Sequence, residues 1–140
     1  MKSIHCYTLM ALLMVFSFSL KAQNRITVGL DDFHRVNTWG RMDVELIPSE
    51  SNEMEIIARN GDPRDVSIEI EEGELKLKLK PDFGDDNEVK IRLPYDFLRY
   101  IEAAGGAVIN SREKLYGKAT RFNANTGGKI ELTVEMQRIE

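Results

Sequence analysis

Cysteine and histidine are almost absent from this chain. Cys6 is the single cysteine among 140 residues, and His5 and His34 are the two histidines. Transition metals are bound mainly by clustered Cys and His side chains, so this composition argues against such a metal centre. A serine nucleophile would have to use His34 as its base, and no Gly-x-Ser-x-Gly motif accompanies it. We therefore expect no enzyme activity and no cofactor.

Phosphate-binding loops and basic clusters are missing as well. The sequence contains neither Gly-x-Gly-x-x-Gly nor Gly-x-x-x-x-Gly-Lys, the two patterns that cradle phosphates. Its 23 Asp and Glu outnumber its 19 Lys and Arg, which gives a net charge of −4. Because binding to nucleic acid requires clustered cations, we expect no nucleic-acid partner.

Long hydrophobic runs are absent outside the N-terminus. Lys2 precedes an apolar run from Tyr7 to Leu20, which has the length of a signal-peptide core and is too short for a comfortable membrane span. Ala22 follows as a small residue, so residues 1–22 are predicted to be a signal peptide and residues 23–140 a single domain. An uncleaved N-terminal anchor is the alternative. We expect an exported protein, in the periplasm, on the cell surface or secreted, with no membrane span after cleavage.

Cleavage would change the charge and the redox chemistry. Removal of Lys2 and Lys21 lowers the Lys and Arg count from 19 to 17, and against 23 acidic residues this gives a net charge of −6. Cys6 would also be lost. The mature chain would then have no disulfide and no thiol, although its compartment permits disulfides.

Alternation of apolar and polar residues with a period of two runs through the mature chain and predicts an all-β fold. It is clear in residues 42–46 and 54–58, which we interpret as an antiparallel pair joined by a polar turn. Residues 66–70 and 75–79 alternate on either side of Gly73, a pattern that predicts a β-hairpin. Residues 95–104 have a weak helical pattern, but they follow Pro94 and are better interpreted as one turn leading into a strand.

One segment repeats. "IEAAGGAVI" (101–109) returns as "FNANTGGKI" (122–130), and the two match at an offset of 21 residues. Each copy reads as two short strands joined by a corner of small residues, and repeats this short must stack on their neighbours. The antiparallel hairpins are thus predicted to lead into a short β-solenoid, or β-helix-like, stack of Gly/Ala-cornered rungs. Its structural corners are predicted at Gly105, Gly106, Gly127 and Gly128.

The order of these elements resembles a known family. "MDVELIPSE", "DVSIEIEEGELKLKL", "VKIRLP" and the paired corners "IEAAGGAVI" and "FNANTGGKIEL" are similar to the head GIN domain family, described as putative auto-transporter adhesins. The resemblance covers roughly residues 32–134. It implies a secreted or surface-associated β protein with stacked rungs, and a short member of the family. It supplies no catalytic or binding residues.

Acidic side chains provide a metal candidate and a catalytic alternative. Asp82, Asp85, Asp86 and Glu88 surround Gly84, and crowded oxygen ligands of this kind bind Ca²⁺ weakly in extracellular proteins. A solvated loop is the competing interpretation, and the spacing is not that of an EF-hand. Glycoside hydrolysis would need two carboxyl groups facing across a cleft, whereas alternation places Glu69 and Glu71 on a flat outer face.

These patterns favour a non-catalytic extracytoplasmic interaction module, adhesin-like and with an unidentified ligand. The alternative is a carbohydrate-active or carbohydrate-binding β-solenoid protein. A solenoid end without a cap presents unpaired backbone groups, and residues 136–140 are too few to cover one. We therefore expect the C-terminal β edge to pair with a second copy, as a homodimer, or with another envelope protein.

Overall fold

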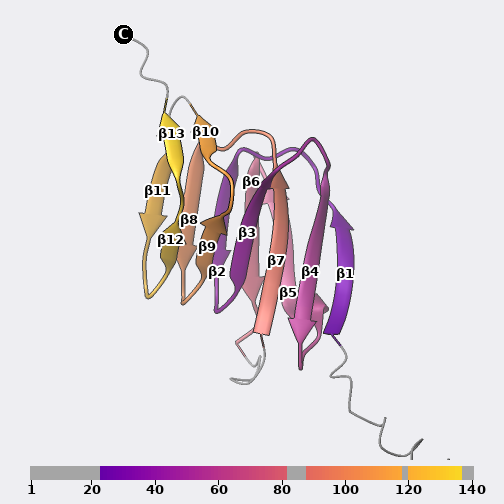
Figure 1. Ribbon diagram of the computed structural model, residues 1–140. Coiled ribbons are helices and arrows are strands. Elements are labelled where there is room, and N and C mark those ends of the chain that lie inside the picture. The colour runs from indigo at the N-terminus through magenta and orange to yellow at the C-terminus, as the bar shows by residue number, and fades with distance from the viewer. Residues whose placement is uncertain (1–22, 82–87, 118–119, 137–140) are drawn as a thin grey trace, which may run out of the picture.

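The computed structural model describes residues 23–81, 88–117 and 120–136 (Figure 1). The predicted signal peptide and the calcium candidates Asp82, Asp85 and Asp86 lie outside these residues. The first strands are β1 (Gln23–Gly29), β2 (Arg35–Trp39), β3 (Asp43–Pro48), β4 (Glu53–Arg59), β5 (Val66–Glu71), β6 (Glu74–Leu79) and β7 (Glu88–Tyr95). They are followed by β8 (Tyr100–Ala104), β9 (Val108–Ser111), β10 (Leu115–Gly117), β11 (Arg121–Ala124), β12 (Lys129–Glu131) and β13 (Val134–Met136).

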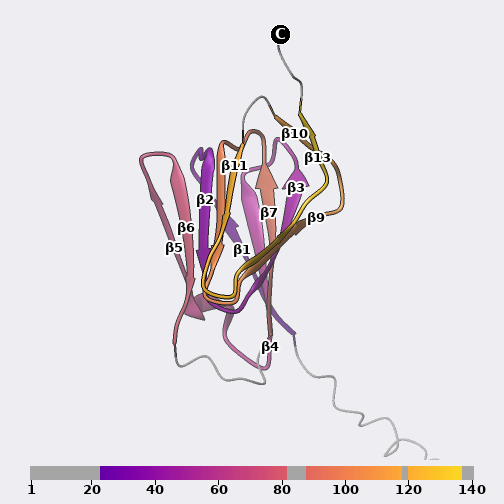
Figure 2. The same ribbon diagram turned by 90° about the vertical axis from the view of Figure 1, so that its left-hand side faces the viewer.

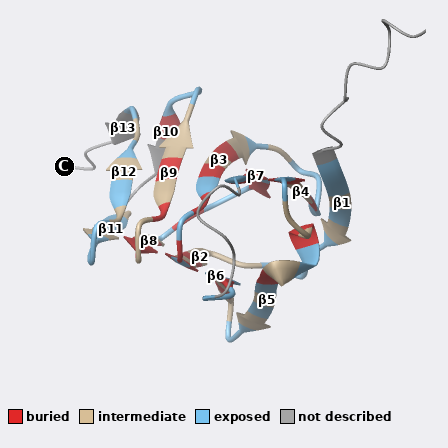
Figure 3. Ribbon diagram, turned by 90° about the horizontal axis from the view of Figure 1, so that it is seen from below, coloured by how far each residue is buried: buried red, intermediate tan, exposed pale blue. Residues whose placement is uncertain are grey.

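The strands form two mixed sheets, which confirms the predicted all-β class. One sheet has the order β1-β4-β7-β3-β9-β12, the other has the order β11-β8-β2-β6-β5, and β10 and β13 form a separate parallel pair. Within the described residues the helical structure is one 3₁₀ turn, η1 (Pro63–Asp65), whose first turn is capped by the Asp62 carboxylate. The two sheets do not close into a barrel (Figure 3).

The predicted hairpin is confirmed as β5 and β6. The two strands pair antiparallel with Glu71 opposite Glu74, so the turn consists of Glu72 and Gly73 alone. Both turn residues have positive φ, 50° and 75° respectively. Two-residue loops of this kind match the right-handed twist of the flanking strands, which explains why glycine stands at the second position.

The predicted antiparallel pairing of residues 42–46 with residues 54–58 is wrong. These residues do form β3 and β4, but β7 lies between the two strands. It pairs parallel with β3 and antiparallel with β4. The short polar turn after Pro48 therefore crosses over the end of β7 to connect β3 with β4. The length of this turn does not distinguish such a crossing from a direct hairpin.

Three segments of the chain pair side by side in parallel. Each consists of two strands joined at a corner: β2 and β3, then β8 and β9, then β11 and β12 (Figure 2). Phe122 pairs with Ile101 and Ile130 with Ile109, which is the 21-residue offset expected from the sequence. The first strand of each segment belongs to the five-stranded sheet and the second to the six-stranded sheet.

The hydrophobic core lies between the two sheets (Figure 3). Its fully enclosed side chains come from the inward positions of both sheets and include Val36, Val44, Leu46, Met54, Ile56, Leu75, Leu77, Ile91, Leu93, Ile101, Ile109 and Leu115. Packing is continuous from the β1 and β5 end to the third segment. There the inward side chains Phe122 and Ile130 are only partly covered.

Candidate functional site

The outer face of the five-stranded sheet carries a group of polar and aromatic side chains. Strand alternation turns Val36 and Thr38 into the core and directs Asn37 and Trp39 outward from β2. In the paired strand β8, Glu102 lies in register with Asn37, and Asn123 of β11 lies in register with Glu102. Three parallel strands therefore bring these side chains into one row.

The carboxylate of Glu102 is the centre of a hydrogen-bond network. Its Oε2 accepts from the Tyr100 hydroxyl at 2.8 Å and from Asn37 Nδ2 at 3.5 Å. Its Oε1 accepts from Asn123 Nδ2 at 3.4 Å and from Asn125 Nδ2 at 3.2 Å. One carboxylate thus orients three side-chain amides and one phenol that come from three adjacent segments.

Tyr100 is tied into the same network electrostatically. The hydrogen bond from Asn123 Nδ2 to its hydroxyl, at 3.4 Å, lowers the pKa of the phenol. The hydrogen bond to Glu102, desolvation and the nearby negative charges act the other way, and the net effect raises the pKa above 10.0. The phenol therefore stays protonated and donates to Glu102 throughout the physiological range.

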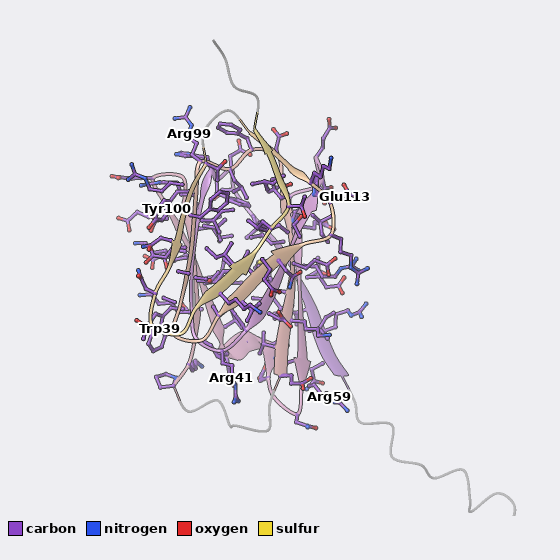
Figure 4. All side chains as sticks on the ribbon, turned by 60° about the vertical axis from the view of Figure 1, so that its left-hand side comes forward. Trp39, Arg41, Arg59, Arg99, Tyr100 and Glu113 are labelled. Carbon is purple, nitrogen blue, oxygen red and sulfur yellow. The ribbon has the colours of Figure 1, made fainter. Side chains whose placement is uncertain are left out.

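Trp39 lies two residues after Asn37 on the outward face of β2 and is 46% exposed. Figure 4 shows it on the same side of the molecule as Tyr100. A Cβ atom built on Gly105 would lie 3.0 Å from Cε2 and 3.1 Å from Cδ2 of the indole. These two atoms form the bond shared by the two rings, so the glycine faces the flat side of the indole. One face of Trp39 consequently rests on the corner glycine, which leaves the exposed area mainly on the other face.

The outer face of the six-stranded sheet has a different character, because several of its charged side chains form ion pairs. Arg25 contacts Glu55 at 3.3 Å, and Arg112 contacts Glu45 at 3.3 Å. Exposed pairs of this kind contribute only a few tenths of a kcal/mol each, up to about 1 kcal/mol. This face is therefore solvated and self-paired, without an exposed tryptophan.

Both sheets end at strands of the third segment. β11 is the last strand of the five-stranded sheet and β12 the last of the six-stranded sheet. Phe122 occupies the same inward position as Ile101, yet it is 37% exposed, whereas Ile101 is 0% exposed. The C-terminal edge, defined here as β11 and β12, thus combines sheet-edge backbone with partly uncovered apolar side chains.

The sequence-predicted corner glycines lie in the turns of the second and third segments. Gly105, Gly106 and Gly127 have φ of +64°, +87° and +77°, a region that favours glycine. Gly128 is constrained by space instead, since a Cβ there would lie 2.0 Å from the carbonyl oxygen of Ala103. That these corners stabilise the stacked segments stays a prediction.

The calcium candidates cannot be assembled into a site from the described residues. Asp82, Asp85 and Asp86 lie outside them, and Glu88 is exposed and pairs with Arg59 at 3.8 Å. In the described ranges no group of three or more His, Cys, Asp and Glu side chains is placed to hold a metal ion. His34 is a packing residue, because its imidazole occupies the space where a Cβ on Gly73 would lie.

Sequence reasoning did not single out Trp39, Tyr100, Glu102 or the three asparagines. A signal was available in part, because the 21-residue offset aligns Glu102 with Asn123 and Ala104 with Asn125. The pairing of β2 with β8 brings Asn37 and Trp39 to this row. The 21-residue repeat, which relates residues 101–109 to residues 122–130, does not include β2 and could not predict this pairing.

Comparison with solved structures places the fold among a set of bacterial proteins. A putative adhesin from Parabacteroides merdae has a TM-score of 0.64 at 22% identity, over 75% of this chain and 45% of that chain. A putative adhesin from Bacteroides fragilis has a TM-score of 0.69 at 12% identity, over 82% and 56% respectively. A putative lipid binding protein from Parabacteroides distasonis has a TM-score of 0.66 at 16% identity, over 82% and 51%.

These likenesses concern the fold, since the identities are low. The chain spans about half the length of the solved structures that it matches. No curated protein matches it. None of the helical structure in the described residues is long and apolar enough to cross a membrane. The family profile described as "Putative auto-transporter adhesin, head GIN domain", a domain of unknown function, matches residues 32–140, and the chain therefore belongs to the head GIN domain family.

Proposed function

We propose that this protein is an exported, non-catalytic interaction module of adhesin type, acting in the periplasm, at the cell surface or after secretion. Membership of a family described as putative auto-transporter adhesins supports this role. The signal-peptide pattern of residues 1–22 supports export. N-terminal sequencing of the exported protein tests that part, with Gln23 expected as the first residue. Recovery of the full-length chain in the membrane fraction would contradict it.

The three parallel segments act in this proposal as rungs of a short β-solenoid. Their in-register pairing on two sheets, and the corner that joins the strands of each segment, support this interpretation. A solenoid grows by adding rungs to its open end, because each new rung pairs its backbone with the one before. The C-terminal edge then has the geometry of a surface that accepts a further rung.

The exposure of Phe122 is the observation that carries the proposal. Its register partner Ile101 is 0% exposed, while Phe122, facing the same way, is 37% exposed. Ile130 and Leu132 are also only partly buried at this end. An apolar inner layer bounded by two sheet edges is the arrangement to which another β strand adds, with main-chain hydrogen bonds supplying affinity.

The occupant that we propose is a second copy of the chain. A two-fold axis perpendicular to both sheets, at their shared edge, would pair β11 with β11 of the second copy and β12 with β12. Both pairs would be antiparallel. Such an isologous contact uses the same patch twice, so the partly exposed Phe122 of each copy would be covered by the other. The same edge could instead accept a strand from a different envelope protein, and the experiment distinguishes these occupants.

Light scattering of residues 23–140 at increasing concentration tests the proposal. We expect dimers, which Phe122→Arg converts to monomers because it places a charge in the apolar contact. Phe97→Arg is the matched control, since Phe97 is similarly exposed, at 41%, but lies outside β11 and β12. A chain that stays monomeric at all concentrations would contradict the second-copy proposal. Phe122-dependent capture of one envelope protein by that monomer would assign the edge to a different occupant.

A further inference from the structure

The row of side chains around Glu102 and the exposed indole of Trp39 form a surface separate from the inward-facing Phe122, and its chemistry points to a ligand of its own. We infer that this surface, defined by Trp39, Asn37, Tyr100, Glu102, Asn123 and Asn125, binds a carbohydrate. The inference does not depend on dimerisation through the C-terminal edge. It rests on the polar groups that remain after the network has formed and on the orientation of the indole.

The network directs hydrogen-bonding groups toward solvent. Glu102 accepts from four donors, two at each carboxylate oxygen, so its own capacity is used. Because the donors must face the carboxylate, the Nδ2 atoms of the three asparagines point toward Glu102. Their Oδ1 atoms form no hydrogen bond within the part of the chain that the structure describes. These fixed acceptors suit the hydroxyl groups of a sugar.

The indole supplies the apolar half of the site. Its inner face rests on Gly105 and its side chain remains 46% exposed. The C–H bonds on one side of a pyranose ring carry slight positive charge and pack against the negative face of an aromatic ring. The indole packs directly against the backbone of Gly105, where any residue with a Cβ would collide with it, and this contact restricts the indole before a ligand binds. Little ordering cost therefore has to be met when a ligand stacks there.

The spacing between the aromatic and the amides fits one or two sugar rings. Trp39 lies in register with Ala104 of β8, and by the 21-residue offset Ala104 corresponds to Asn125. Two inter-strand spacings, about 10 Å, separate the backbone of Trp39 from that of Asn125, and the indole, which lies against Gly105 of the intervening segment, covers part of this span. The residue between them is Ala104, which has a short side chain and is itself buried, at 8% exposure. A ring stacked on Trp39 would thus direct its hydroxyls toward Asn125 and Asn37.

Composition distinguishes this ligand class from others. The four donors around Glu102 are neutral, so the carboxylate keeps its negative charge, and Lys76 and Lys78 of β6 lie in register with Asn37 and Trp39. Both charge signs are therefore present beside the neutral amides, and neither defines the ligand. Protein interfaces usually bury about 800 Å² per partner around a cluster of apolar anchors, whereas this surface offers one aromatic side chain among amides. Glycoside hydrolysis would need a second carboxylate, and the network contains Glu102 alone, which favours binding without cleavage.

Tryptophan fluorescence provides a direct test, because Trp39 is the single tryptophan of the chain. Residues 23–140 are titrated with maltotriose, cellotriose, mannotriose and a trimer of N-acetylglucosamine, each to about 10 mM, a concentration that nearly saturates a site with a Kd of about 1 mM. We expect a saturable change in the emission of Trp39 with at least one of these probes. Asn125→Ala, which keeps the indole, should weaken that binding about tenfold, since one amide is lost.

Control variants separate a binding defect from a folding defect. Ile57→Ala lies on the outer face of the other sheet and should leave the titration unchanged. Trp39→Ala, followed by calorimetry, should abolish binding while the variant still unfolds cooperatively. If none of the four probes changes the emission of Trp39, the inference is overturned. Retention of wild-type affinity in Asn125→Ala and Trp39→Ala would overturn it equally, and Trp39-dependent capture of a protein in place of a sugar would assign the surface to a protein partner.

Discussion

Gly128 and Ala103 approach so closely that no side chain fits between them: a Cβ built on Gly128 would lie 2.0 Å from the carbonyl oxygen of Ala103. This contact joins the corner of the third segment to β8 of the second. It is reinforced by the hydrogen bond from Asn125 N to the same carbonyl oxygen, at 2.9 Å. The contact fixes how near two successive segments can lie, and it makes the corners open to direct test.

Gly128→Ala should be the most damaging alanine substitution at these corners. The added methyl group meets backbone atoms, which cannot rotate away, so the segments must separate. We expect the free energy of unfolding to fall by about 2 kcal/mol or more, as for overpacked sites. Urea denaturation measures the change.

The flanking glycines provide a graded comparison. A Cβ at Gly106 meets no atom closer than 3.9 Å, and the same holds at Gly127, but both residues have positive φ. Alanine there should cost about 1 kcal/mol, through backbone strain alone, and valine more than that. Gly106→Asn should cost less than Gly106→Ala, because asparagine tolerates this region. Equal, negligible losses for Gly106→Val and Gly127→Val would remove the argument that these corners support stacked segments.

Glu102→Gln should destabilise the fold although it changes few atoms. The amide of glutamine brings an N–H group into a position that faces the Asn and Tyr donors, so part of the network is lost. We expect a loss of about 1–2 kcal/mol in the free energy of unfolding, measured by urea denaturation. Glu69→Gln is the matched control, because Glu69 is an exposed carboxylate on the same sheet face. Its effect should stay within about 0.5 kcal/mol.

The stability of the protein should fall in alkaline solution. Burial, followed by the negative charge of Glu113, raises the pKa of Tyr95 above 10.0, and the pKa of Tyr100 is raised as well. The folded chain therefore holds these protons more tightly than the unfolded chain. The contribution of these two groups to stability is constant well below pH 10.0, and it declines as the pH rises through their folded-state pKa values. Chemical denaturation at several alkaline pH values measures this decline, and Tyr95→Phe should make it shallower. An unchanged slope in that variant would contradict the assignment to Tyr95.

Local features of the sequence were sufficient to predict the strands and the hairpin. Alternation located β5 and β6, and Gly73 located the turn, because these elements depend on residues within a few positions of one another. The 21-residue offset also predicted the parallel register of β11 on β8, since identical spacing in two copies leaves only one alignment. The coiling of the segments into a solenoid stays a proposal.

The sequence was insufficient to predict which strands pair when they lie far apart along the chain. β3 and β4 are consecutive and joined by a short turn, so they looked like partners, although β7 enters between them from a distant part of the chain. The site around Glu102 was hidden for the same reason. Trp39 and Glu102 lie 63 positions apart in the printed sequence, and only the pairing of β2 with β8 brings them together.

Residue-resolved hydrogen exchange of the edge amides tests the proposed interaction edge most directly. Arg121 N donates to Arg99 O, Asn125 N to Ala103 O and Lys129 N to Ala107 O, all in the second segment or next to it. Alternation therefore turns the amides of Phe122, Ala124 and Ile130 away from the neighbouring strands. We predict that these three amides exchange rapidly at about 1 μM, where the chain is dissociated, and become protected at about 500 μM, where the edges pair. A strict monomer whose Phe122, Ala124 and Ile130 amides are already protected at the lower concentration would show that the chain covers its own edge, and would contradict the account.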